Sequence, residues 1–303
     1  MRIGIDLGGT KIEAIALDAQ GAELRRVRVA TPRGDYGRTV GAIRDLSLEM
    51  EHWLGERGTV GVGIPGTVVA TTGLVKNANS TWLNGMPLQR DLCTALDREV
   101  RCANDANCFA VSEAIDGAGQ GAGVVFGVIL GTGCGGGISI GGKVHAGLNG
   151  LGGEWGHTPL PWAKGDELPG PACYCGRHGC LEGWISGTGF AWDFARETSR
   201  DLRGSEIVEA AAHGDDSAEE AIQRLTSRIA RGLAVVVNIV DPDVIVLGGG
   251  LSNLDRLYDG ELARQMSEYC FGGGVTTPIR RNVHGDSSGV RGAAWLWPEI
   301  ATS

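Results

Sequence analysis

Gly4-Ile5-Asp6-Leu7-Gly8-Gly9-Thr10 is a short apolar run that ends in a glycine turn, and residues 127–133 (Gly-Val-Ile-Leu-Gly-Thr-Gly) repeat this pattern further along the chain. A second apolar run follows each of them, so each pair of runs predicts a β-hairpin with a glycine tip. A tip without Cβ atoms lets several backbone N–H groups point at a phosphate. Either loop alone also fits a plain tight turn, but two loops in matching positions favour a phosphate site.

The segments around the first loop predict three strands, a helix, a strand, a helix, a strand and a helix. The expected strands are 3–9, 12–17, 23–30, 60–66 and the run that ends before residue 105, and the expected helices are 39–54, 88–99 and the residues from 105 onward. The order starts again after residue 117, with strands at 124–130 and 138–140, a helix at 217–239, a strand at 244–247 and a helix at 289–296. The long helix carries Ser217 and Glu220 in capping-box spacing.

This repetition predicts an α/β protein with two similar βββαβαβα halves around a cleft. That is the architecture of the actin-like (ribonuclease H-like) ATPases and sugar kinases. The expected domains are residues 1–117, joined by a C-terminal helix at 289–303, and residues 118–288, which contain the cysteine-rich segment 154–182.

Composition and charge exclude several classes of function. Hydrophobic residues make up 42% and charged residues 21% of the 303 residues, which indicates a globular chain. The net charge of −9 argues against a nucleic-acid surface, which needs a basic stripe. No run of about 18 apolar residues predicts a membrane span, and the chain enters its first strand without a hydrophobic leader. We therefore expect a cytoplasmic protein that binds neither nucleic acid nor a membrane.

Asp105 stands where an apolar strand meets a helix, within Asn104-Asp105-Ala106-Asn107. The unpaired N–H groups and the positive dipole end of that helix favour an ionised carboxylate. An ordinary N-cap is the alternative interpretation. With glycine loops on either side in the sequence, we predict that Asp105 is the catalytic base that takes the proton of a substrate hydroxyl in phosphoryl transfer.

A third glycine run, 248–250, follows a predicted strand and completes a predicted ATP site. In the actin-like arrangement the first two loops hold the β- and γ-phosphates, and the third lies beside adenosine. Asp6 is expected to face Mg²⁺, directly or through water, although a strand-end Asp that caps a turn fits its position equally well. The predicted ATP-binding residues are Asp6, Gly8, Gly9, Thr10, Lys11, Gly131, Thr132, Gly133, Gly248, Gly249 and Gly250.

One histidine and three cysteines offer the donor set that zinc prefers, namely His157, Cys173, Cys175 and Cys180. Three cysteines this close together in a chain without a secretion signal indicate metal binding and not disulfides. Unrelated buried thiols are the alternative interpretation. Four protein ligands close the coordination sphere, so we expect a structural zinc ion.

Polar side chains near this cluster predict a sugar site. Glu154 and Glu182 flank the metal segment, where carboxylates can accept hydrogen bonds from pairs of sugar hydroxyls, and Asn79 and Asn104 add amides. Solvated surface acids are the alternative interpretation of the two glutamates.

Together these residues resemble the ROK family (repressors, open reading frames and sugar kinases) over essentially the whole chain. The resemblance runs through Asp6-x-Gly-Gly-Thr-Lys11, Gly-Ile-Pro-Gly66, Asn104-Asp105-Ala-Asn107, Gly131-Thr-Gly, Glu154-x-Gly-His157 and Cys173-x-Cys-Gly-x-x-Gly-Cys180-x-Glu182. It implies Asp105 as the base, sugar contacts from Gly66, Glu154, His157 and Glu182, and a homodimer. It also implies that His157 serves zinc through one ring nitrogen and sugar through the other.

Within the family, residues 76–85 and 154–162 resemble the manno(fructo)kinases. We therefore expect an ATP-dependent hexose kinase that converts fructose to fructose 6-phosphate and also accepts mannose. Trp82 and Leu83 are expected to narrow the wall where an N-acetyl group would lie. An N-acetylglucosamine kinase or glucokinase is the alternative. A sugar-responsive repressor is a remote one, because the first glycine loop begins too early to leave room for a helix-turn-helix module.

Overall fold

The computed structural model describes residues 1–285 and 288–297. The chain forms two compact units. Unit 1 contains Met1–Gly121, Gly137–Gly153 and the C-terminal stretch that includes α9 (Ser288–Ala294), and unit 2 contains Ala122–Gly136 and Glu154–Gly285. Residues 298–303, the end of the expected C-terminal helix, lie outside the described residues.

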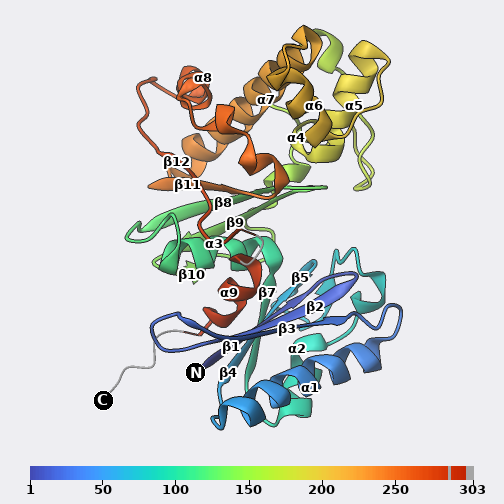
Figure 1. Ribbon diagram of the computed structural model, residues 1–303, viewed down its shortest axis with the longest axis vertical. Coiled ribbons are helices and arrows are strands. Elements are labelled where there is room, and N and C mark those ends of the chain that lie inside the picture. The colour runs from blue at the N-terminus through green and yellow to red at the C-terminus, as the bar shows by residue number, and fades with distance from the viewer. Residues whose placement is uncertain (286–287, 298–303) are drawn as a thin grey trace. The chain divides into compact units, whose positions relative to one another are not determined.

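Unit 1 is built on a five-stranded sheet in the order β3-β2-β1-β4-β7 (Figure 1). Its strands are β1 (Arg2–Leu7), β2 (Lys11–Leu17), β3 (Glu23–Ala30), β4 (Thr59–Ile64) and β7 (Val100–Asn104). The first three strands pair antiparallel, and β4 and β7 continue the sheet parallel to β1. A separate small ribbon joins β5 (Thr67–Val68) to β6 (Val75–Lys76).

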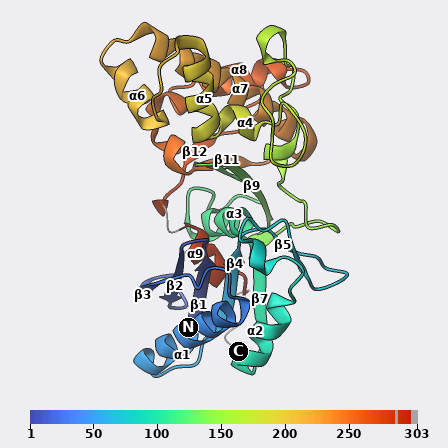
Figure 2. The same cartoon turned by 90° about the vertical axis from the view of Figure 1, so that its right-hand side faces the viewer.

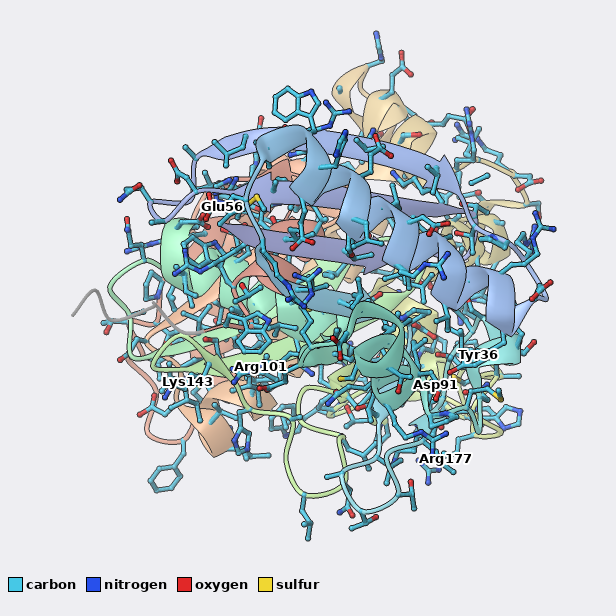
Figure 3. All side chains as sticks on the ribbon, turned by 90° about the horizontal axis from the view of Figure 1, so that it is seen from below. Tyr36, Glu56, Asp91, Arg101, Lys143 and Arg177 are labelled. Atoms are coloured by element: carbon cyan, nitrogen blue, oxygen red, sulfur yellow. The ribbon has the colours of Figure 1, made fainter. Side chains whose placement is uncertain are left out.

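Helices cover both faces of this sheet. Figure 1 shows α1 (Tyr36–Leu54) and α2 (Leu88–Leu96) on one face and α9 on the other, next to α3 (Asp105–Asp116). The Tyr36 hydroxyl donates to the Asp91 carboxylate over 2.7 Å and so ties α1 to α2 (Figure 3). On the opposite face α9 approaches α3 closely, because a Cβ at Gly292 would lie 1.7 Å from the carbonyl oxygen of Cys108. Only glycine permits that approach.

The second sheet has the order β10-β9-β8-β11-β12. Its strands are β8 (Val124–Leu130), β9 (Cys134–Ile140), β10 (Lys143–Val144), β11 (Val244–Gly248) and β12 (Ile279–Arg281). In unit 2, Figure 2 shows the helices gathered beyond β11 and β12. They are α4 (Glu182–Ile185), α5 (Gly187–Thr198), α6 (Gly204–Ala212), α7 (Asp216–Val240) and α8 (Glu261–Tyr269). Single 3₁₀ turns occur at Thr81–Leu83, Trp155–His157, Gly165–Glu167, Gly250–Asn253 and Asp255–Leu257.

The element order confirms the predicted duplication and the actin-like α/β fold class. The first half runs β1-β2-β3-α1-β4-α2-β7-α3 with β5 and β6 inserted after β4, and the second runs β8-β9-β10-α7-β11-α8-β12-α9 with α4, α5 and α6 inserted before α7. Among the described helices, none combines the length and the apolar character that a membrane crossing requires.

Three local predictions are wrong. The expected helix 88–99 ends at Leu96, because Asp97 adopts a left-handed conformation with φ 49° and caps it. The proposed capping box at Ser217 does not form, since Asp215 is the N-cap of α7 and accepts from the Ala218 amide. The second glycine loop is shorter than expected, because β9 begins at Cys134. In addition, α4, α5, α6 and α8 were not predicted at all.

Candidate functional site

Asp105 is the first residue of α3 and is exposed. The N-cap is Asn104, whose side-chain oxygen accepts from the Ala106 amide over 2.9 Å and from the Asn107 amide over 3.4 Å. The interpretation of Asp105 as the N-cap is therefore wrong. The Asn104 amide group donates to the carbonyl oxygen of Gly66 over 3.1 Å, so this end of β7 is tied to the turn after β4.

Asp6 lies on β1 close enough to Asp105 for the two carboxylates to interact. The pKa of Asp6 is raised to about 7, mainly by burial and also by the negative charges of Asp105 and Glu13. When two carboxylates lie near each other, each disfavours the ionised form of the other. A hard divalent cation offsets this repulsion when it binds between them. The donor set therefore fits the Mg²⁺ that accompanies ATP.

The first glycine loop is a tight turn whose tip faces solvent. The Gly8 amide donates to the Lys11 carbonyl over 3.0 Å, and Gly9, Thr10 and Lys11 are exposed. The Thr31 hydroxyl supports this turn by donating to the Gly8 carbonyl over 2.8 Å. This support could not be predicted from the sequence, because Thr31 follows β3 and no local pattern links it to the loop.

The second glycine loop is fastened to the helices that follow the metal segment. The Gly187 amide donates to the Gly131 carbonyl over 2.7 Å, and the Thr188 hydroxyl donates to the Thr132 carbonyl over 2.8 Å. One oxygen of Glu182 accepts from the Cys134 amide over 2.9 Å. These contacts fix the loop between β8 and β9 within unit 2.

The third glycine run lies at the same end of the unit 2 sheet as the second loop. β11 pairs parallel with β8, and Gly248 lies opposite Ile129, so both strands finish at one edge. Ligands of α/β sheets bind beyond the carboxyl ends of such strands. Gly249 and Gly250 lead from that edge into a 3₁₀ turn.

Segment 77–85 contains Asn79, a predicted sugar contact, and it contains Trp82 and Leu83, which were expected to line the sugar site. Asn79 is exposed. The Trp82 indole N–H donates to the Thr39 hydroxyl over 3.3 Å, and the Leu83 side chain is fully buried in the unit 1 core. The expectation that Leu83 forms part of a wall against an N-acetyl group is therefore wrong, whereas the same expectation for the partly buried Trp82 stays a prediction.

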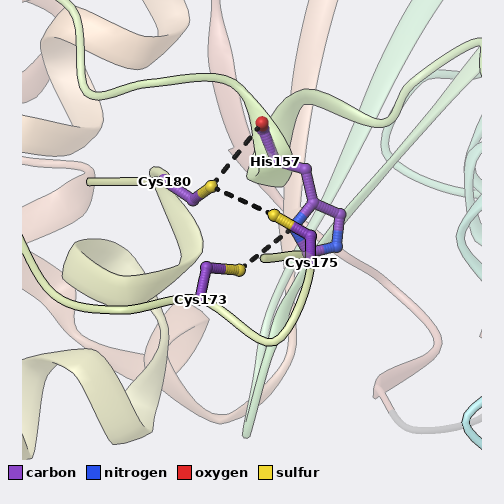
Figure 4. Close-up of side chains that lie close together, drawn as sticks. All are labelled: His157, Cys173, Cys175 and Cys180. Carbon is purple, nitrogen blue, oxygen red and sulfur yellow. Dashed lines mark hydrogen bonds between the residues drawn. The ribbon is translucent and has the colours of Figure 1, made fainter. Parts of the chain in front are cut away.

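The four predicted metal ligands converge. Their donor atoms all lie within 4.8 Å of one another, and Figure 4 shows the side chains turned toward a common centre. The Cys173 sulfur lies 3.5 Å from His157 Nδ1, and the sulfurs of Cys175 and Cys180 are 3.6 Å apart. Tetrahedral zinc with thiolate and imidazole ligands requires separations of about 3.5–3.8 Å, so this donor set fits zinc.

The other ring nitrogen of His157 faces away from the cluster. His157 Nε2 lies 2.8 Å from the Tyr174 hydroxyl, and the two rings meet edge to face. Partial desolvation, followed by the negative charge of Glu182 and, more weakly, of Glu154, raises the pKa of Tyr174 to about 12. His157 thus contacts the Tyr174 hydroxyl, and the charges of both predicted sugar-binding glutamates act on it.

A buried ion-pair network supports the metal segment. Glu167 accepts from Arg231 over 2.6 Å and from Arg228 over 3.0 Å, and Arg231 also donates to the carbonyls of Pro161 and Trp162. Burial opposes the ionisation of Glu167, but hydrogen bonds from Arg231 and Arg228 outweigh it and lower the pKa of Glu167 to about 2. The sequence offered no signal for this network, because its members lie on the 3₁₀ turn Gly165–Glu167 and on α7, far apart along the chain.

The sites are divided between the two units. Unit 1 holds Asp6, the first glycine loop, Gly66, Asn79, Asn104 and Asp105. Unit 2 holds the other two glycine segments, the metal cluster, Glu154 and Glu182. An exposed carboxylate at a helix start, a cation partner and glycine loops are the parts that phosphoryl transfer to a hydroxyl needs.

Known proteins that are similar to this chain include sugar kinases. The model of the ROK family matches residues 2–300. N-acetyl-D-glucosamine kinases from Yersinia pseudotuberculosis serotype O:1b (strain IP 31758) and Haemophilus influenzae (strain 86-028NP) are both 40% identical to this chain, over 300 and 302 residues. Each alignment covers 98% of this chain, and it covers 98% of the first relative and 99% of the second.

Two solved structures are also similar. A ROK hexokinase from Thermus thermophilus superimposes with a TM-score of 0.85 at 34% identity, covering 97% of both chains. A ROK family glucokinase from Streptomyces griseus, in complex with glucose and AMPPNP, gives a TM-score of 0.76 at 31% identity, covering 97% of this chain and 98% of the other.

Proposed function

This chain belongs to the ROK family and is an ATP-dependent sugar kinase, and from that premise we propose that it phosphorylates the 6-hydroxyl of a hexose with Asp105 as the general base. The observation that carries the proposal is the start of α3, where Asn104 supplies the helix cap and leaves the Asp105 carboxylate exposed beside the helix N-terminus. That position favours the ionised form that a base requires.

In the proposed reaction, Asp105 takes the proton of the sugar hydroxyl. The oxygen then forms a bond to the γ-phosphorus, and the bond between that phosphorus and the β,γ-bridging oxygen breaks to release ADP. The three glycine segments are the proposed ATP contacts, with Lys11 and Thr132 at their tips. Mg²⁺, which Asp6 would hold, supplies charge neutralisation on the phosphates when bound.

We assign the sugar contacts to Gly66, Asn79, Asn104, Glu154, His157 and Glu182. Paired hydrogen bonds between sugar hydroxyls and carboxylates or amides discriminate strongly among sugars, because a wrong substrate leaves a buried partner unpaired. Zinc bound by His157 and the three cysteines would hold Glu154 and Glu182 at a fixed spacing. This role is structural, because four protein ligands leave no open position.

N-acetylglucosamine is the first candidate substrate. The relatives that carry this substrate in their names are 40% identical over almost the entire chain. Leu83 is fully buried and therefore offers no steric reason to exclude an N-acetyl group.

Fructose, with mannose as a second substrate, is the other candidate. It rests on residues 76–85 and 154–162, which resemble the manno(fructo)kinases. The structure gives segment 77–85 a defined shape, since Asn84 closes it through two hydrogen bonds of 2.9 Å to the backbone of Ala78.

An ATP-coupled assay with fructose, mannose, glucose, N-acetylglucosamine and N-acetylmannosamine separates these candidates. The highest kcat/KM identifies the substrate, and ³¹P–¹H correlation in the product identifies the phosphorylated hydroxyl. A product phosphorylated at another hydroxyl, or no turnover of any of the five, would contradict the proposal. We further propose a cytoplasmic homodimer, which sedimentation of the purified protein tests for its oligomeric state.

A further inference from the structure

One carboxylate in unit 2 contacts the second glycine loop although the resemblance assigns it to the sugar. Glu182 Oε2 accepts from the Cys134 amide over 2.9 Å, and Cys134 follows the loop directly. A Cβ at Gly133 would lie 2.7 Å from the same oxygen. Real Cβ atoms do not approach an oxygen so closely, so the carboxylate packs on the loop because residue 133 is glycine.

We propose that Glu182 couples the two substrates: the carboxylate that binds the sugar also positions the backbone loop that binds the phosphates. The inference rests on the proposed function, since it takes Glu182 as a sugar contact and residues 131–133 as a phosphate loop. It adds a role that neither assignment contains, namely that Glu182 is a positioning residue for the nucleotide.

Hydrogen bonds around Glu182 connect its segment to the metal site and to the second glycine loop. Glu182 opens α4 two residues after the metal ligand Cys180, and the Leu181 amide between them donates to the Thr158 carbonyl over 2.9 Å. The Gly187 amide, just beyond α4, donates a hydrogen bond to the Gly131 carbonyl in the second glycine loop. The loop is therefore held by the ends of the segment that carries the carboxylate, and a shift of either part displaces the other.

The energetics favour a measurable effect. A hydrogen bond to an ionised carboxylate is stronger than one between neutral groups, so Glu182 holds the Cys134 amide firmly. A sugar that orders this carboxylate also orders the loop, and coupling between two binding sites is reciprocal by thermodynamic necessity. Sugar should therefore tighten nucleotide binding, and nucleotide should tighten sugar binding by the same factor.

The test is Gly133→Ala, measured by calorimetric titration of the sugar substrate in the absence of nucleotide. The new methyl group has to displace the flexible end of Glu182, so we expect the sugar Kd to rise about 10-fold. The matched control is Gly41→Ala in α1, outside the proposed sites, where a Cβ meets nothing within 4 Å. The control should leave the sugar Kd within about twofold of wild type, and the zinc content of both variants should equal that of wild type.

A second variant tests the opposite direction. Glu182→Ala frees the Cys134 amide, so AMPPNP should bind about 5-fold more weakly even without sugar. In the wild type, sugar should tighten AMPPNP binding, and in Gly133→Ala this effect should vanish.

Two outcomes overturn the inference while leaving the proposed function intact. One is an equal sugar Kd in the two glycine variants, and the other is an unchanged AMPPNP Kd in Glu182→Ala. If wild type binds none of the five hexoses, the proposed function fails and the inference fails with it.

Discussion

The carboxylates of Asp6 and Asp105 lie at the ends of different elements, β1 and α3, yet the charge of Asp105 contributes to raising the pKa of Asp6 to about 7. Burial is the larger cause. The pair places a proposed base beside a proposed cation partner. A divalent cation bound there would offset the repulsion between the two carboxylates.

This relationship predicts a pH-dependent stability difference for Asp6→Asn. In the unfolded chain Asp6 ionises near its ordinary pKa of 3.8, whereas in the folded protein it stays protonated until about pH 7. Wild type therefore loses stability relative to the variant as the pH rises from about 4 to about 7, and the difference is constant above that range. The difference in Tm, measured with EDTA and without nucleotide, should grow across this window.

The same experiment in an Asp105→Asn background provides the control. Removing the neighbouring charge lowers the pKa of Asp6, so the Tm difference should level off at a lower pH. A Tm difference that stays constant from about pH 4 to about pH 8 would contradict the predicted shift.

Asp105→Asn should nearly abolish turnover while leaving the fold and sugar binding intact. The amide keeps the shape of the side chain but cannot accept the hydroxyl proton, and general-base contributions are roughly 10²–10⁴-fold in kcat. The matched control is Asp216→Asn, the same change at the exposed first residue of α7. Retention of more than about a tenth of wild-type kcat in Asp105→Asn would rule out the base role.

Much of the fold was predictable because its signals are local. Alternating apolar runs and glycine tips marked β1, β2, β8 and β11. The metal ligands were predictable for the same reason, since three of the four fall within Cys173–Cys180.

Long-range contacts were not predictable. Nothing near Trp82 in the sequence indicates that its indole reaches Thr39, so this contact was missed. Helix α5 was missed because it begins with glycines and buries the charged residue Asp193, which interrupts its apolar face. The contact between Glu182 and the second loop joins residues 48 positions apart, which no spacing rule reaches.

Loss of the metal should affect the sugar before the nucleotide. Cys175→Ser removes one ligand, so segment 154–182 relaxes and Tm falls, because metal sites of this kind contribute folding energy. We expect a raised sugar KM and a smaller rise in the Kd for AMPPNP, because the Glu182 carboxylate is kept while the segment that carries it shifts. Cys93→Ser, at a cysteine outside the cluster, should change neither. Elemental analysis that finds no zinc in active protein would contradict the assignment.

The final prediction concerns the ion-pair network under the metal segment. Glu167→Ala leaves Arg228 and Arg231 buried without their shared carboxylate, although Arg228 keeps its second partner, Asp193, at 2.9 Å. Breaking a buried pair of this kind costs about 3–5 kcal/mol, far more than a surface pair. The neighbouring substitution Asp166→Ala, at a side chain that is 68% exposed, is the matched control and should cost at most about 1 kcal/mol.

Denaturant unfolding of both variants measures the difference, and it tests a functional consequence as well. Arg231 donates to the carbonyls of Pro161 and Trp162, which follow His157 in the chain. When Glu167 no longer holds Arg231, the backbone after this metal ligand loses its support. Glu167→Ala should therefore also raise the sugar KM, whereas Asp166→Ala should not. Equal unfolding free energies in the two variants would mean that the network does not support the metal segment.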